Sequence, residues 1–307
     1  MRLVFLGTAE FACPALTAIQ QAYDVALVVT QPDRPVGRHA VLTPPPVKVE
    51  ALRLGLPVFQ PVRVNSSDAI GRIRDARPDA IVVAAYGQLL KPELIGIPPL
   101  GTINIHASLL PRYRGAAPIN WAIIRGETET GITTFLIDPG MDTGPILMQR
   151  ATGIGPDETA GELHDRLAVL GAELILETLS GIESGRLTPI PQDDSAASLA
   201  PRLSRDDGMI DWSRPAQEIH NLIRGTNPWP GAFTHLAGKR VKVHRSRLTG
   251  IKRGEHRPGM IALRGTGRLL VAAGDELLEL LEVQREGRPR VSGREFLNGL
   301  RGEVKFS

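Results

Sequence analysis

The first 150 residues alternate short, nearly continuous apolar runs with stretches in which apolar residues recur every three or four positions. The apolar runs have the length of strands and are rich in Val, Ile and Leu, whereas residues 10–22 and 46–55 have helical spacing. Apolar strands separated by helices are typical of a parallel sheet covered on both faces. The pattern predicts a Rossmann-like, doubly wound α/β domain with strands at residues 2–7, 24–30, 78–87, 101–106 and 131–140.

The pattern changes twice in the second half of the chain. Residues 158–182 have the spacing of one long amphipathic helix, and residues 186–206 are rich in Pro, Ser and Asp without a sustained period. A helical stretch then precedes short strands separated by glycine turns, which is typical of a small barrel. We therefore predict an N-terminal domain over residues 1–185, a linker over 186–206 and a small OB-like β-barrel domain over 207–307.

Composition is that of an ordinary globular protein, with 42% hydrophobic and 22% charged residues. We find no run of roughly 18 apolar residues, and the short N-terminal apolar run is followed by Glu10 rather than by a signal-peptide cleavage site. Cys13 is the single cysteine, which excludes an internal disulfide and a cysteine-based metal cluster. We expect a cytoplasmic enzyme that does not contact a membrane.

Charge is divided unevenly along the chain. Residues 208–307 carry 18 Lys and Arg against 10 Asp and Glu, whereas the remaining residues carry 18 basic and 23 acidic side chains. The basic residues are densest at 239–257, where eight Lys and Arg stand against one acidic residue. A basic second domain indicates a polyanionic partner, although an arginine-rich surface also arises without one, and composition leaves both readings open.

Candidate chemistry lies where the strand 101–106 ends. Ligands of open parallel sheets bind beyond the carboxyl ends of the strands, and Asn104 and His106 are two residues apart there, so their side chains share one face. An amide donor beside an imidazole can stabilise a carbonyl oxygen that gains negative charge and can move a proton. A lone histidine in this position is more often structural, so the hypothesis requires a third group.

The loop after the strand 131–140 offers two carboxylates. Asp138 begins an Asp-Pro-Gly turn, for which a structural role is sufficient, whereas Asp142 lies between glycines without such a turn. Asp142 is therefore the better candidate to face His106, whose protonated form it would favour, but spacing alone does not show that they meet. Rival sites are absent from the sequence, because it has no GxGxxG after the first strand, no phosphate loop, no HExxH and no GxSxG around Ser108.

Several motifs, in order across nearly the whole chain, resemble those of the methionyl-tRNA formyltransferase family. The core pattern, Asn-x-His-x-Ser-Leu-Leu-Pro with a downstream Asp, is shared by the wider folate-dependent formyltransferases. The Pro-Asp-Arg-Pro loop and the basic second domain narrow the resemblance. The motifs are GTAEFA (7–12), TQPDRPVGR (30–38), VAAYGQLL (83–90), INIHASLLPRYRGAAPINWAI (103–123), GITTFLIDPGMDTGPIL (131–147) and NPWPGAF (227–233).

The resemblance implies a formyltransferase whose chemistry requires no metal, and we expect a monomer, although the sequence does not determine the oligomeric state. It would transfer the formyl group of 10-formyltetrahydrofolate to the α-amino group of methionine on initiator methionyl-tRNA, for translation initiation. Asn104, His106 and Asp142 would form the catalytic group. The folate would contact Ser108, Leu109, Leu110 and Pro111. The tRNA would contact Arg34 and Arg38, in the loop 31–48, and Lys239, Arg240, Lys242, Arg245 and Arg247.

Two features leave alternatives open at this point. His39, Ala40 and Val41 follow Arg38 where family members often carry lysines, so the residue that leads the loop's tRNA contact is not identified. The same catalytic core could act on an amino sugar nucleotide or another small amine, or hydrolyse the formyl-folate, although an amine-specific relative would have no use for a basic second domain. A non-catalytic RNA-binding protein is the alternative from another class, and the intact Asn-His-Asp set argues against it.

Overall fold

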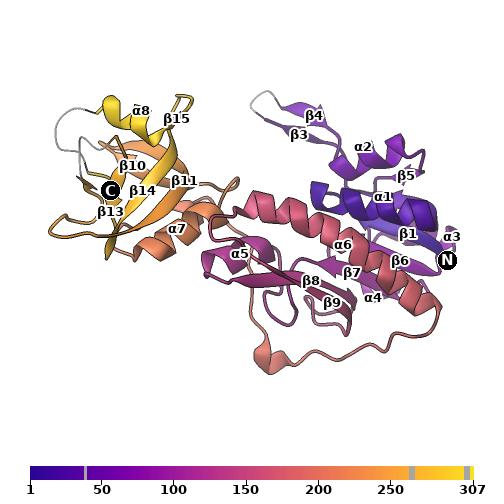
Figure 1. The fold of residues 1–307 in the computed structure, drawn as a ribbon. Helices are drawn as coiled ribbons and strands as arrows, with labels where there is room; N and C mark the ends of the chain where they lie inside the picture. Colours follow the sequence, from indigo (N-terminus) through magenta and orange to yellow (C-terminus); the bar gives the residue numbers. More distant parts are fainter. Residues whose placement is uncertain (38–39, 263–266, 301–304) are drawn as a thin grey trace. The chain divides into compact units, whose positions relative to one another are not determined.

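The computed structural model describes residues 1–37, 40–262, 267–300 and 305–307. They form two compact units, each considered by itself (Figure 1). The first unit comprises residues 1–115, 130–152 and 164–200, and the second comprises 116–129, 153–163 and 201–307. Within the described ranges, no helix combines the length and the apolar character that crossing a membrane requires.

The first unit is built on a seven-stranded sheet with the strand order β5-β2-β1-β6-β7-β8-β9. The strands from β5 to β7 all run parallel, as the apolar pattern predicted for β1, β2, β6 and β7, whereas β5 was not predicted. The bounds are β1 (Arg2–Gly7), β2 (Asp24–Val29), β5 (Val58–Phe59), β6 (Ala80–Ala84), β7 (Thr102–His106), β8 (Glu129–Leu136) and β9 (Ile146–Gly153).

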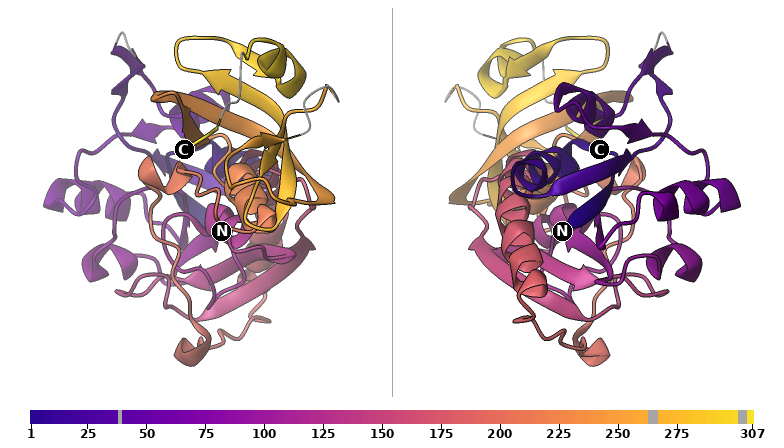
Figure 2. Two further views of the ribbon diagram at one scale, coloured as in Figure 1. Left: turned by 90° about the vertical axis from the view of Figure 1, so that its left-hand side faces the viewer. Right: turned by 90° about the vertical axis from the view of Figure 1, so that its right-hand side faces the viewer.

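Helices cover both faces of this sheet, which confirms the doubly wound prediction. Figure 2 shows α1 and α6 on one face and α3 and α4 on the other. Val4 and Leu6 of β1 pack in one apolar cluster with Ile73 of α3 and Leu94 of α4. The helices are α1 (Cys13–Ala22), which follows the 3₁₀ turn η1 (Glu10–Ala12), α2 (Pro46–Arg53), α3 (Ser67–Asp75), α4 (Pro92–Ile95) and α6 (Ala160–Glu183).

The sheet departs from a purely parallel arrangement at β8. β8 runs antiparallel to β7, with Ile103 opposite Leu136 and His106 opposite Thr133. The reason lies in the connection from β7 to β8, whose helix α5 (Pro118–Ile124) packs against α7 (Ala216–Gly225) in the second unit rather than crossing over the sheet. The loop after β8 therefore leaves the sheet at the amino end of β7, not at its carboxyl end.

The second unit contains a curled antiparallel sheet that forms a half-barrel. Its strand order is β10-β11-β14-β13-β12, with β15 paired to β14. Phe306 forms an isolated bridge with Leu236 of β10 and Lys305 forms one with Met260, so the C-terminal residues lie between the two end strands. The elements are α7 (Ala216–Gly225), β10 (Ala232–Leu236), β11 (Lys239–Lys252), β12 (Ile261–Ala262), β13 (Leu270–Ala272), β14 (Glu276–Arg285), β15 (Arg290–Ser292) and α8 (Gly293–Asn298).

The core of this second unit explains the order of its elements along the chain. Ile219 and Ile223, one helical turn apart on α7, are buried with Val241 and Val243 of β11 and with Val283 of β14. The helix therefore fills the concave side of the curled sheet. The predicted helix-then-strands pattern is confirmed, whereas the short strand β10 between them was not predicted.

Candidate active site

Asn104 and His106 project from the face of β7 that α6 does not cover. The neighbouring Ile105 points the other way, toward α6. Its Cγ2 atom lies so close to Gly171 of that helix that a Cβ on this glycine would be 3.0 Å from it. His106 is 6% exposed and packs edge-on against Phe135 of β8, whereas Asn104 is only partly buried. The strand's two-residue period thus places an amide and an imidazole side by side on one face.

Each ring nitrogen of His106 has a different neighbour. Nε2 lies 2.9 Å from the carbonyl oxygen of Tyr113, and because a carbonyl only accepts, Nε2 carries a hydrogen and donates it. Nδ1 lies 3.7 Å from Oδ2 of Asp142, a distance suited to an ion pair but too long for a direct hydrogen bond. The backbone of the loop after β7 therefore fixes the ring, and Nδ1 is the nitrogen available for proton transfer.

Asp142 reaches His106 because the loop 137–145 folds back over the face of β7. The backbone of Asp142 has φ of 56°, in the left-handed region, and its Oδ2 atom accepts the backbone N–H of Gly115 at 2.8 Å. Gly144 permits the tight return, since a Cβ there would lie 1.7 Å from the carbonyl oxygen of Leu136. By contrast, Asp138 accepts the backbone N–H of Gly140 at 3.0 Å, the turn role expected of it.

Gln192 holds this loop in place, a role that was not predicted. Its Nε2 donates to the carbonyl oxygen of Asp142 at 2.9 Å and to that of Gly144 at 2.7 Å. Its Oε1 accepts from the buried Arg114 at 3.1 Å and 2.7 Å, and Arg114 also pairs with Asp194 at 2.7 Å. Gln192 lies in the segment predicted as a linker, where no periodic pattern singles it out.

More of that predicted linker contributes hydrogen bonds to the site. Ser198 Oγ accepts the backbone N–H of Tyr113 at 2.9 Å, and the Ser198 carbonyl accepts that of Arg114 at 2.8 Å. Ala200 donates to the carbonyl of Arg114 at 2.7 Å. The chain from 190 to 200 thus braces the same loop after β7 whose Tyr113 carbonyl orients His106.

The predicted folate segment, Ser108 to Pro111, lies in that loop and is largely internal. Ser108 is fully buried, its hydroxyl donates to the carbonyl of Arg112 at 2.7 Å, and Leu110 is 3% exposed. The backbone N–H of Leu110 donates to Oγ1 of Thr133 at 3.1 Å. Leu109 and Pro111 are the partly exposed members, so they offer the segment's surface to a ligand while Ser108 and Leu110 fix its shape.

The proline-rich loop that carries Arg34 contains a short hairpin of β3 (Arg34–Val36) and β4 (Val41–Thr43). Arg34 is exposed and donates to Oε1 of Gln31 at 2.6 Å, and Arg38 lies outside the described residues. The base of the hairpin is fixed by Asp33, which pairs with Lys48 at 2.7 Å. Hydrogen bonds from Gln60 and Lys48 lower the pKa of Asp33, which keeps this carboxylate charged.

The predicted basic strand is β11, and its alternation is interrupted at His244. The pairing with β14 shifts between Val243 and Arg245, so His244 is an extra residue in β11 and the side chains after it face the side opposite to the one that strict alternation predicts. Lys242, Arg245 and Arg247 are consequently all exposed, while His244 and Ser246 are buried. Of the other predicted contacts, Lys239 is exposed and the guanidinium of Arg240 lies over the Phe233 ring, 3.9 Å from its centroid. Strict alternation would have placed the side chains of Lys242 and Arg245 on opposite faces of the strand.

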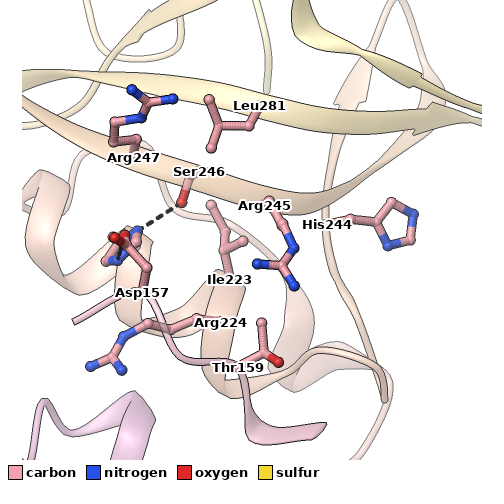
Figure 3. Close-up of a pocket in the computed structure, with 10 residues that line it drawn as sticks. Asp157, Thr159, Ile223, Arg224, His244, Arg245, Ser246, Arg247 and Leu281 are labelled. Atoms are coloured by element: carbon pink, nitrogen blue, oxygen red, sulfur yellow. Dashed lines mark hydrogen bonds and ion pairs between the residues drawn. The ribbon is translucent and has the colours of Figure 1, made fainter. Parts of the chain in front are cut away.

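A pocket of about 430 Å³ opens beside this strand, within the second unit (Figure 3). Arg245 reaches from β11 toward Thr159 and pairs with Glu162 at 2.6 Å. Buried Arg224 donates to the carbonyls of Gly155 and Glu158 and so holds the segment before α6. The lining residues are Asp157, Thr159, His220, Ile223, Arg224, His244, Arg245, Ser246, Arg247 and Leu281.

Within the part of the chain that the structure describes, no cluster of three or more His, Cys, Asp or Glu is placed to hold a metal ion.

Two family models match the sequence. The formyl transferase model matches residues 1–179, and the model of the formyl transferase C-terminal domain matches residues 202–301.

Two curated relatives match almost end to end. The methionyl-tRNA formyltransferase of Geobacter metallireducens is 51% identical over 304 residues, covering 99% of this chain and 97% of its own. That of Solibacter usitatus is also 51% identical, over 302 residues that cover 98% and 96% of the two chains.

Solved structures share the fold at much lower identity. A sugar 3N-formyltransferase solved in the presence of dTDP and 5-N-formyltetrahydrofolate has a TM-score of 0.69 and 19% identity, covering 94% of this chain and 99% of its own. HypX from Aquifex aeolicus in complex with tetrahydrofolic acid has a TM-score of 0.64 and 18% identity over 99% of this chain and 50% of its own.

Proposed function

The chain belongs to the formyltransferase family, among the methionyl-tRNA formyltransferases, and on this premise we propose how its residues formylate initiator methionyl-tRNA. The donor is 10-formyltetrahydrofolate, and the acceptor is the α-amino group of the esterified methionine. The observation that carries the assignment is the approach of His106 and Asp142 to 3.7 Å on the face of β7 that also presents Asn104. The reaction joins the formyl carbon to the amine nitrogen and releases tetrahydrofolate.

The donor fits the loop that follows β7. A folate needs an apolar wall beside groups that do not move, and Leu109 and Pro111 offer partly exposed apolar surface. Their positions are supported by the buried Ser108 and by the bond from Leu110 to Thr133. A formyl group held beside this loop would lie next to the Asn104 and His106 side chains.

The three catalytic residues have different tasks in this mechanism. Attack by the neutral amine turns the formyl carbonyl into a tetrahedral oxyanion, which the Asn104 amide stabilises by hydrogen bonding and a protonated His106 stabilises by its charge. The α-amino group has a pKa of roughly 7.7–8.0 in model compounds, so a strong base is not required for attack. Asp142 stabilises the protonated imidazole.

Proton transfer completes the step. The attacking nitrogen becomes an ammonium and loses one proton, while the departing folate nitrogen gains one as its bond to the formyl carbon breaks. His106 Nδ1 is suited to pass this proton, because Nε2 is already bonded to the Tyr113 carbonyl. Water is the alternative relay along the same path.

The basic residues contribute binding rather than chemistry. Lys242, Arg245 and Arg247 are exposed on β11, and Arg34 is exposed at the start of the β3–β4 hairpin. Contacts from such side chains to phosphates give affinity that falls with salt and does not read sequence. The apolar residues Val41 and Leu42 of β4, 62% and 65% exposed, add surface that suits an unpaired acceptor end.

A matched pair of substitutions in one loop tests the assignment. Asp142→Asn keeps the size and the left-handed backbone that Asn also tolerates, but removes the charge facing His106. Asp138→Asn makes the same change at a carboxylate that serves the turn. We expect Asp142→Asn to lower kcat by about 10²–10³-fold, in the range of losing one transition-state contact, and Asp138→Asn to lower it less than about tenfold.

Formylation of methionyl-tRNA with 10-formyltetrahydrofolate is the assay, with His106→Ala and Asn104→Ala alongside. Near-normal turnover in His106→Ala would contradict the mechanism. Transfer to an amino sugar nucleotide in preference to methionyl-tRNA would contradict the choice of acceptor while leaving the catalytic group intact.

A further inference from the structure

A tight turn at residues 226–230 of the second unit displays an exposed tryptophan. Trp229 is 54% exposed, whereas Trp212 of the same unit is 5% exposed and donates its indole N–H to Thr234. An indole has a large apolar surface, so leaving more than half of it in water costs free energy that burial would recover. The mechanism proposed above makes no use of this side chain.

The turn is held rigidly by its backbone and its flanking residues. Asn227 Nδ2 donates to the carbonyl of His244 at 2.7 Å, and the Asn227 carbonyl accepts the backbone N–H of Gly161 at 3.0 Å. Gly231 donates to the carbonyl of Thr226 at 2.9 Å, which closes the turn. A Cβ on Gly161 would lie 3.0 Å from Cδ of Pro228, so the turn packs closely on the start of α6. Trp229 is therefore displayed on a fixed support, which reduces the entropy lost on binding.

The same two anchors bring a cation close to the turn. Arg245 follows His244 on β11, and its guanidinium pairs at 2.6 Å with Glu162, which follows Gly161 on α6. Both side chains of that ion pair are about half exposed, 49% and 48%, so an incoming phosphate can compete for Arg245. The turn that carries Trp229 is thus bonded to His244 and Gly161, the neighbours of Arg245 and Glu162 along the chain. Arg245 itself lines the pocket together with Thr159 and Arg224.

This combination favours a nucleotide over an apolar protein partner. A specific protein interface buries a large area, whereas the exposed aromatic side chain here is Trp229, and residues 208–307 around it carry 18 Lys and Arg against 10 Asp and Glu. Single-stranded nucleic acids need no such broad interface, because their bases stack on individual aromatic rings and their phosphates contact nearby cations. A paired base exposes no free face, so the ligand must be unpaired.

We propose that Trp229 stacks on an unpaired base of the tRNA substrate while Arg245 contacts a phosphate of the same strand. This inference rests on the proposed function, because it takes the tRNA as the ligand. Stacking is largely independent of salt, and the phosphate contact is not. The two residues should therefore have separable effects on the salt dependence of binding.

The experiment measures tRNA affinity over a range of salt, and kcat/KM for methionyl-tRNA, in the full-length protein. Trp229→Ala should weaken affinity by roughly 5- to 150-fold without changing the salt slope, the range that base–aromatic stacking gives. Trp229→Phe should stay within about threefold of wild type, because a phenyl ring still stacks. Arg245→Ala should reduce the slope of log affinity against log salt by about 0.7–0.9.

Met209 provides the matched control, since it is 53% exposed in the same unit and Met209→Ala should leave affinity unchanged. The inference is overturned if Trp229→Ala binds tRNA like Met209→Ala, or if Trp229→Phe is as weak as Trp229→Ala. Bound tRNA should also quench the tryptophan fluorescence of the wild-type protein more than that of Trp229→Phe, which has lost the indole that stacks. Equal quenching in both proteins would refute stacking. A wild-type protein that fails to formylate methionyl-tRNA would instead contradict the proposed function.

Discussion

Removing the carboxamide of Gln192 should lower turnover by releasing the loop that carries Asp142. Gln192→Ala deletes two hydrogen bonds to this loop, at 2.9 Å and 2.7 Å, and the acceptor for Arg114. Neutral hydrogen bonds contribute about 0.5–1.5 kcal/mol each, so the loop conformation that faces His106 loses about 1–3 kcal/mol. That loss of free energy corresponds to a fall in kcat of about 5- to 150-fold.

Formylation kinetics with both substrates varied provide the assay for Gln192→Ala. We expect kcat to fall while KM for methionyl-tRNA changes little, because the substitution disturbs the alignment of Asp142 rather than a binding surface. Asp194→Ala is the matched control. Its carboxylate is 79% exposed and also pairs with Arg114, so removing it should cost less than about fivefold.

A double-mutant cycle decides whether Gln192 acts through Asp142. If it does, adding Gln192→Ala to Asp142→Asn should lower kcat by less than about threefold further, because the charge that Gln192 positions is already gone. Full additivity of the two effects would refute the reasoning, as would a Gln192→Ala enzyme with wild-type kcat.

Three further predictions concern other parts of the molecule. Lys242→Ala should reduce the slope of log tRNA affinity against log salt by about 0.7–0.9 and leave kcat unchanged; an unchanged slope would remove Lys242 from the interface. Burial lowers the pKa of His220, so the unfolded chain binds more protons, and the free energy of unfolding should fall as pH drops below about 6.5. Urea denaturation at pH 5–8 should show a weaker fall in His220→Gln, and an identical pH profile would contradict the reasoning. Burial, assisted by Glu50, raises the pKa of Cys13 to about 11, so iodoacetamide should alkylate this thiol slowly at pH 7.5, and mass spectrometry showing the rate of free cysteine would contradict this.

The parts of the fold that sequence could predict are those governed by local pattern. Continuous apolar runs predicted the parallel strands β1, β2, β6 and β7 but not the two-residue strand β5, and three-to-four spacing predicted α1, α2 and α6. The antiparallel β8 could not be predicted in this way, because its direction depends on α5 packing against α7 instead of on the sheet. Strand direction is a property of the connection, which the strand's own residues do not encode.

The same limit applies to the site. The i, i+2 spacing placed Asn104 and His106 on one face, and choosing Asp142 over Asp138 followed from turn chemistry. Gln192 escaped detection because its role depends on a contact across about 50 positions of chain, in a segment with no periodic pattern. The bulge at His244 was not predicted, because the register shift depends on pairing with β14. This bulge decides which basic side chains of β11 are exposed.

We propose that one group of residues on β7 and its facing loop transfers a formyl group to methionyl-tRNA. The most direct measurement follows labelled formyl from 10-formyltetrahydrofolate in a single turnover, with wild type and Asp142→Asn assayed in parallel. We expect label on the methionine amine of charged initiator tRNA with wild type, and transfer slowed by about 10²–10³-fold in the variant. Absence of labelled methionyl-tRNA with wild type, or equal rates in the two proteins, would contradict it.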